Sequence, residues 1–180
     1  GIDGPLAIFR SDYDGRMYWA EGSSFAIRYV DDAGNIQTFA GDPSYIPGVD
    51  YPGAGHVADG TYAANSFALN VKGGLVQDTD GNFYFTTTRH QLRRISADGT
   101  QIETLAGIFD SPGYTGDNLE GTSSRLSSPA GLAMDLDGTI LIADQGNGLI
   151  RRYDPNTGML TDVAGVPGEF NYNGNYMEVN

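Results

Sequence analysis

Three short sequence markers recur in the same order along this chain, and they constrain its fold more than any other feature. The first marker is an Asp-Gly dipeptide, with spacings of 66 and 57 residues between its copies. It occurs as Asp14-Gly15, Asp80-Gly81 and Asp137-Gly138. An aliphatic-Arg pair follows each copy, as Ile27-Arg28, Leu92-Arg93 and Ile150-Arg151, and an Ala-Gly pair closes each unit, at Ala40, Ala106 and Ala164. An internal period of this length indicates a repeat protein.

The third copy of the unit, between residues 129 and 165, reads as four short strands joined by tight turns. The strands are expected over 131–134, 139–143, 149–153 and 159–163. An Asp-Gly dipeptide suits the positive φ angles of a hairpin turn, and short strands at this spacing are typical of an antiparallel all-β fold. Four strands cannot bury both of their faces alone, so each unit needs a neighbour. The sequence therefore predicts an all-β fold of three four-stranded antiparallel β-propeller blades.

The segment SSPAGLAMDLDGTILIADQGNGLIRRYDPNTGMLTDVAG resembles NHL-type β-propeller repeats. These repeats share a small-apolar strand, Asp-Gly, an apolar strand ending in Asp, Gly-Asn, Ile-Arg and Ala-Gly. The resemblance is close over residues 114–165, fair over 74–107 and loose over 5–41, and Thr87 stands where the third unit has Asp144. It implies a propeller fold and no particular activity, because the family includes binding modules, scaffolds and enzymes.

The expected blades cover residues 5–41, 74–107 and 131–165, and long inter-blade loops cover 42–73, 108–130 and 166–180. Propellers close with 4–8 blades, and this chain has three. We therefore expect it to be part of a larger propeller or to be completed by another copy, because an isolated arc would expose two apolar blade faces.

The charge balance and composition exclude several classes of partner. The formal net charge of −13 argues against binding to nucleic acid phosphates. There is no cysteine, so neither disulfides nor thiolate metal sites can form, and no apolar run is long enough to span a membrane. Richness in Gly, Tyr and Asp with one Lys favours an extracellular or cell-surface location.

Candidate partner-binding residues fall on one end of the expected blades. Successive hairpin turns alternate between the two ends, so the tight Asp-Gly turns lie at one end and the long loops at the other. Loops held by a rigid scaffold commonly carry binding residues. The candidates are Tyr45, Tyr51, His56, Tyr62, His90 and Tyr114.

The acidic residues have mainly structural interpretations. Asp14, Asp80 and Asp137 each belong to an Asp-x-Asp-Gly turn and are expected to bond the turn backbone. The pairs Glu21/Arg28 and Asp144/Arg151 have equal separations and are expected to form cross-strand ion pairs. Asp59 and Asp117 occupy comparable positions in two loops; they are the candidates for calcium, although a structural role is favoured.

No convergent catalytic set is visible, since two histidines are too few for a His-rich zinc centre and no nucleophile elbow is present. The preferred hypothesis is a non-catalytic propeller scaffold that binds a protein or glycan partner and needs no cofactor. One alternative is a calcium-dependent propeller hydrolase or lactonase, suggested by the acidic balance. Another is a structural subunit whose copies self-assemble into a ring or fibre.

Overall fold

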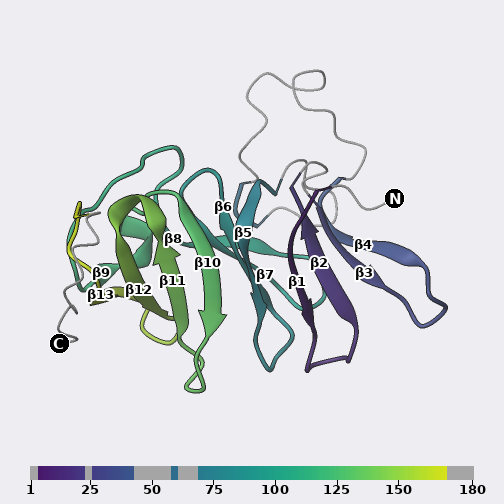
Figure 1. Cartoon of the computed structure of the whole chain (residues 1–180). Helices are drawn as coiled ribbons and strands as arrows, with labels where there is room; N and C mark the ends of the chain where they lie inside the picture. The colour runs from purple at the N-terminus through teal and green to yellow at the C-terminus, as the bar shows by residue number, and fades with distance from the viewer. Residues whose placement is uncertain (1–3, 23–25, 43–57, 61–68, 170–180) are drawn as a thin grey trace, which may run out of the picture.

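The computed structural model describes residues 4–22, 26–42, 58–60 and 69–169, and its regular structure is nearly all β (Figure 1). The first antiparallel sheet has the order β1-β2-β3-β4 and forms the first blade. Its strands are β1 (Pro5–Arg10), β2 (Met17–Glu21), β3 (Ala26–Val30) and β4 (Ile36–Ala40).

The second and third blades repeat this topology, as β5-β6-β7-β8 and β10-β11-β12-β13. The second comprises β5 (Val71–Gln77), β6 (Phe83–Thr87), β7 (Leu92–Ile95) and β8 (Ile102–Ala106). The third comprises β10 (Pro129–Met134), β11 (Ile140–Asp144), β12 (Leu149–Asp154) and β13 (Met159–Ala164). Short 3₁₀ turns occur at η2 (Gly121–Ser123) and η3 (Gln145–Asn147).

One strand was not anticipated from the sequence. The two-residue strand β9 (Leu119–Glu120) belongs to the loop before the third blade, yet it pairs with β13 at the outer edge of that blade. The loop therefore runs across the outside of the blade that it introduces.

The three sheets are arranged radially, with the first strand of each blade on the inside. Strand β5 contacts both β1 and β10, whereas the later strands of each blade spread outwards (Figure 1). This arrangement confirms the predicted all-β, propeller-type architecture.

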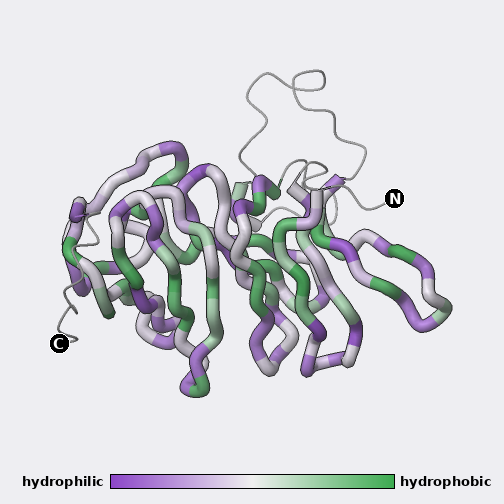
Figure 2. Tube along the Cα trace, viewed as in Figure 1, coloured by the Kyte–Doolittle hydropathy of each residue, from purple (hydrophilic) through white to green (hydrophobic). Residues whose placement is uncertain are grey.

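The hydrophobic core consists of two clusters, each between neighbouring blades. One joins the first and second blades and includes Tyr18, Ile27, Phe83, Phe85 and Ile102. The other joins the second and third blades and includes Tyr84, Leu92, Ile140, Ile142 and Leu160. Apolar residues accordingly follow the strands and polar residues gather at the hairpin turns (Figure 2). Each blade thus uses both of its faces in packing wherever a neighbouring blade is present.

In each Asp-x-Asp-Gly turn an Asp carboxylate bonds the turn backbone, but in the second blade this residue is Asp78 and not the expected Asp80. In the second blade, Asp78 Oδ1 accepts hydrogen bonds from the backbone N–H groups of Asp80 (3.0 Å) and Asn82 (2.8 Å). In the first and third blades, Asp14 and Asp137 each accept an N–H two residues further on, from Arg16 and Thr139. These carboxylates satisfy backbone donors in tight turns, as Asx turns do.

Within the described residues, no helix has the length and apolarity needed to cross a membrane.

Candidate binding face

The two ends of the blades differ in the length of their connections. The β1–β2, β5–β6 and β10–β11 turns are short and share one end, at the bottom of Figure 1. The β8–β10 connection, which includes β9, passes over the opposite end. This opposite end, which we call the loop face, also carries the turn between β6 and β7.

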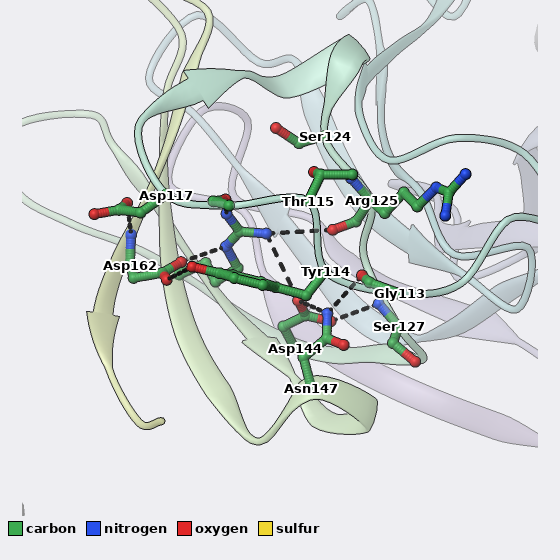
Figure 3. A network of polar contacts seen from close by, with 12 residues as sticks. Gly113, Tyr114, Thr115, Asp117, Ser124, Arg125, Ser127, Asp144, Asn147 and Asp162 are labelled. Carbon is green, nitrogen blue, oxygen red and sulfur yellow. Dashed lines mark hydrogen bonds and ion pairs between the residues drawn. The ribbon is translucent and has the colours of Figure 1, made fainter. Parts of the chain in front are cut away.

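Arg151, on β12, fastens the loop over the third blade. Figure 3 shows the polar network of this region, in which Tyr114, Asp144 and Asp162 are labelled. Its side chain is completely buried; Nε lies 2.8 Å from Asp162 Oδ1, and Nη1 lies 3.9 Å from Asp144 Oδ2. Its Nη1 donates to the carbonyl of Arg125 (3.2 Å) and its Nη2 to the carbonyl of Gly116 (2.8 Å). One guanidinium therefore joins two strands of the blade to two points of the loop, which makes use of its planar set of donors.

Asp144, at the end of β11, is the second centre of this network. Its Oδ1 accepts the backbone N–H of Ser127 (2.7 Å), and its Oδ2 accepts Asn147 Nδ2 (2.7 Å). Asn147 Nδ2 also donates to the Gly113 carbonyl at 2.8 Å. Burial raises the pKa of Asp144, whereas these donors and Arg151 act in the opposite direction. The predicted Asp144/Arg151 pair is therefore present, within a larger network.

Tyr114 belongs to the same network. Its hydroxyl donates to Asp162 Oδ2 at 2.6 Å, and its ring centre lies 5.2 Å from Arg151 Cζ, in cation–π geometry. Burial, together with the hydrogen bond to Asp162, raises the pKa of Tyr114 to about 12. The hydroxyl and ring of this predicted partner-binding residue thus hold the loop in place. Contact with a partner stays a prediction.

The second blade has a simpler version of this clamp. Arg93, almost fully buried, donates from Nη2 to Asp59 Oδ1 at 2.7 Å, and Thr104 Oγ1 donates to the same oxygen at 3.1 Å. Asp59 precedes these residues by 34 and 45 positions. Asp117 precedes Arg151 and Asp162 by the same intervals.

The calcium candidates Asp59 and Asp117 therefore occupy equivalent places. Asp117 Oδ1 accepts the backbone N–H of Asp162 at 2.6 Å, so both carboxylates fasten a loop to a fourth strand. Over the ranges that the structure describes, no group of three or more His, Asp or Glu side chains is placed to hold a metal ion.

Several residues of these clamps were missed from the sequence. They are Arg93, Asn147, Ser127 and Asp162. The signal that could have revealed Arg93 and Asp162 is the pair of equal intervals measured from Asp59 and Asp117, because equal spacing in two repeats predicts equal positions in two blades.

The first blade carries the other predicted ion pair. Arg28 Nη1 lies 3.6 Å from the buried Glu21 Oε2, and Trp19 Nε1 donates to Glu21 Oε1 at 2.9 Å. Both cross-strand pairs anticipated from the sequence are therefore formed.

His90 lies on the loop face, in the turn between β6 and β7. Its φ of +65° is left-handed, and its Nδ1 accepts the backbone N–H of Ser128 at 3.0 Å. Lys72 Nζ donates to the carbonyl of the same serine at 3.1 Å. Neighbouring Arg89 pairs with Asp110 Oδ1 at 3.1 Å. This turn therefore supports the loop on both sides of β9.

The accepting role of His90 predicts an acid-sensitive contact. His90 can accept the hydrogen bond from Ser128 only while its Nδ1 is unprotonated. Burial lowers the pKa of His90 below its ordinary value of 6.5. Because the unfolded histidine binds its proton first as the pH falls, the stability that His90 contributes is complete above about pH 6.5 and is lost as the pH falls through the lowered pKa.

We expect His90→Asn to reduce the fall in melting temperature between pH 7 and pH 5. Asparagine tolerates a left-handed φ and keeps a side-chain acceptor that does not titrate in this range. Thermal melts of both proteins across the pH series measure this effect. Equal acid sensitivity would show that His90 does not contribute.

Tyr45, Tyr51, His56 and Tyr62, the remaining candidates, lie outside the described residues.

The chain is similar in sequence to segments of two much longer proteins. It is 31% identical over 149 residues to SUPPRESSOR OF QUENCHING 1 of Arabidopsis thaliana, a match covering 81% of this chain and 13% of that protein. It is 25% identical over 175 residues to Teneurin-3 of Mus musculus, covering 90% of this chain and 6% of that protein. The chain thus spans only a small part of either relative, and no protein-family model matches it.

Solved structures similar to this chain belong to longer β-propeller proteins. A Bacteroides thetaiotaomicron protein of unknown function has a TM-score of 0.66 at 20% identity, covering 82% of this chain and 34% of its own. An auxiliary nutrient binding protein of Bacteroides ovatus has 0.61 at 17%, covering 92% and 37%. A gluconolactonase of Xanthomonas campestris has 0.55 at 17%, covering 91% and 47%. At these identities the likeness concerns the fold alone, which places the chain among β-propeller proteins.

Proposed function

We propose that this chain is a non-catalytic segment of an NHL-type propeller that binds a protein or glycan partner through its loop face, outside the cell or at its surface. The observation that carries the proposal is the fixing of the loops. Arg93 and Arg151 are buried in the blades, yet each donates a hydrogen bond to a loop: Arg93 to the Asp59 carboxylate and Arg151 to the Gly116 carbonyl. Rigid blades that hold loops in fixed positions are a common basis of binding sites.

The described part of the loop face offers both apolar and charged contact groups. Ile108 is exposed, and Arg89 lies over the ring of Phe109 with its Cζ 5.8 Å from the ring centre. Arg and aromatic side chains are enriched among residues that dominate binding energies. The fold likeness to the auxiliary nutrient binding protein of Bacteroides ovatus is compatible with this role.

The hydrolase alternative has less support. Its motivation was the acidic balance, and the gluconolactonase of Xanthomonas campestris has the same type of fold. However, the two calcium candidates, Asp59 and Asp117, contact donors of the protein. A calcium-dependent enzyme should gain melting temperature on calcium addition. An unchanged melting temperature would dispose of this alternative.

Loop-face substitutions test the binding proposal. The purified chain is applied to an array of defined oligosaccharides and to a panel of purified extracellular-matrix proteins. For any probe that binds, Tyr45→Ala, Tyr51→Ala and Phe109→Ala should weaken affinity by about tenfold or more, as loss of an aromatic anchor does.

The matched control is Leu136→Ala, at a fully exposed position in the β10–β11 turn on the opposite end. It should leave the affinity unchanged. Binding of no probe, or equal weakening by the control, contradicts the proposal.

A further inference from the structure

Each blade has an arginine on its third strand, at equivalent positions of the ladder to the fourth strand. These residues are Arg28, Arg93 and Arg151. In the first and third blades, the arginine lies 3.6 Å or 3.9 Å from a buried carboxylate on the second strand, Glu21 or Asp144. The corresponding residue of the second blade is Thr87. Arg93 is therefore balanced in a different way from the other two arginines.

The carboxylate that pairs with Arg93 comes from the loop before the second blade. Asp59 Oδ1 accepts Arg93 Nη2 at 2.7 Å and Thr104 Oγ1 at 3.1 Å, so a single oxygen makes both contacts. The Arg93 side chain is 4% exposed, whereas the Asp59 side chain is 52% exposed. A buried cation without a charge partner is costly. Asp59 therefore supplies, from the surface, the negative charge that the blade itself supplies to Arg28 and Arg151.

Asp59 leaves part of the guanidinium unused. Within the ranges that the structure describes, Arg93 Nε is buried and has no hydrogen-bond partner. The equivalent atom of Arg151 lies 2.8 Å from Asp162 Oδ1, and the residue equivalent to Asp162 in the second blade is Thr104. A guanidinium can bind both oxygens of one carboxylate through two parallel N–H groups. Arg93 offers such an edge, formed by Nε and Nη2, and Asp59 bonds one of its two donors.

The described groups beside this contact are neutral or already paired. Thr104 Oγ1 accepts Gln91 Nε2 at 3.3 Å, and the neighbouring Arg94 forms an ion pair with Glu103. A ligand with one carboxylate can therefore replace Asp59 without changing the charge around the buried guanidinium. A ligand with several negative charges would be repelled by a chain whose formal net charge is −13.

We propose that Arg93 is a binding site for a ligand that presents a single carboxylate group, and that Asp59 occupies this site while the ligand is absent. The ligand carboxylate displaces Asp59 and binds Nε and Nη2 of Arg93 together. Its arrival also removes the Asp59 clamp, so binding loosens the loop before the second blade. The site is separate from the aromatic contacts of the proposed function, and failure of those contacts leaves this proposal standing.

Removing the internal carboxylate tests the site. The unchanged chain should bind glucuronate, a sugar with one carboxylate, and Asp59→Ala should bind it about tenfold more tightly or better, because Asp59 no longer competes. Isothermal titration calorimetry of the full chain measures both affinities, and Asp59→Asn is a second variant that keeps the side-chain volume. Glucose, which has no carboxylate, should bind to neither protein. Acetate tests the carboxylate without the sugar: binding equal to that of glucuronate supports recognition of the carboxylate alone, and weaker binding supports an acidic sugar.

Two further variants separate this site from a general effect of charge. Arg93→Lys keeps the buried charge but has no planar pair of donors, so adding it to Asp59→Ala should abolish the gain in affinity. Glu103→Ala is the matched control, because it removes one negative charge and frees the exposed Arg94 on the same blade. It should bind glucuronate like the unchanged chain. Absence of binding by the unchanged chain, no gain with either Asp59 variant, an equal gain with Glu103→Ala, or equal binding of glucose would overturn the proposal.

Discussion

Replacing Arg151 with methionine should destabilise the chain by about 4 kcal/mol. The substitution keeps most of the side-chain volume, so the loss measures charge and hydrogen bonding more than cavity formation. It leaves the buried Asp144 without its cation, and it removes the ion pair to Asp162 at 2.8 Å. The carbonyl of Gly116 also loses its guanidinium donor. Breaking a buried pair by removing one partner typically costs about 3–5 kcal/mol.

Urea unfolding followed by circular dichroism measures this loss, and Arg152→Met is the matched control. Arg152 is the next residue on the same strand. Its side chain is 42% exposed, and its Nη2 lies 3.6 Å from Asp135 Oδ2. Exposed pairs of this kind contribute about 0–1 kcal/mol. If the two substitutions lowered the free energy of unfolding by similar amounts, the ion pairs of Arg151 would contribute no more than an exposed pair does. The loop over the third blade would then have to be held by other contacts.

The architecture was predictable from the sequence because it depends on local and repeated signals. Asp-Gly turns, the aliphatic-Arg pairs and short apolar runs each act within one hairpin, so Asp80 and Asp137 indicate turns without knowledge of any distant contact. The cross-strand pairs were predictable for the same reason, since Glu21 and Arg28 are separated by a single hairpin.

The loop clamps were less predictable because they depend on contacts between distant segments. Asp162 lies 48 residues from Tyr114 and 45 from Asp117, and its own strand gives no sign that either will approach it. Likewise, β9 consists of two residues, and only its place beside β13 makes it a strand. Such contacts can be predicted only when the path of the loop is known. Hydrophobic periodicity predicts strands and helices, and it gives no information on the path of a loop.

The Ala-Gly pair that closes each repeat unit also has a tertiary role. Gly107, which follows β8, has a φ of +90° and donates its N–H to the Gly121 carbonyl at 3.1 Å. A Cβ at this position would collide with the backbone carbonyl of His90 and lie 2.9 Å from Gln91 Cα. Glycine therefore allows the chain leaving the second blade to pass directly against the β6–β7 turn.

Gly107→Ala should consequently cost about 3 kcal/mol, combining about 1–2 kcal/mol for a left-handed φ with a similar contribution from the backbone overlap. Gly138→Ala separates the two contributions, because Gly138 has a comparable φ of +82° but open space around its Cβ position. The control should lose only about 1 kcal/mol. Urea unfolding of both variants gives the difference. Equal losses would mean that the loop shifts away from His90 without cost, and the close packing of loop on turn would then contribute nothing to the stability of the loop face.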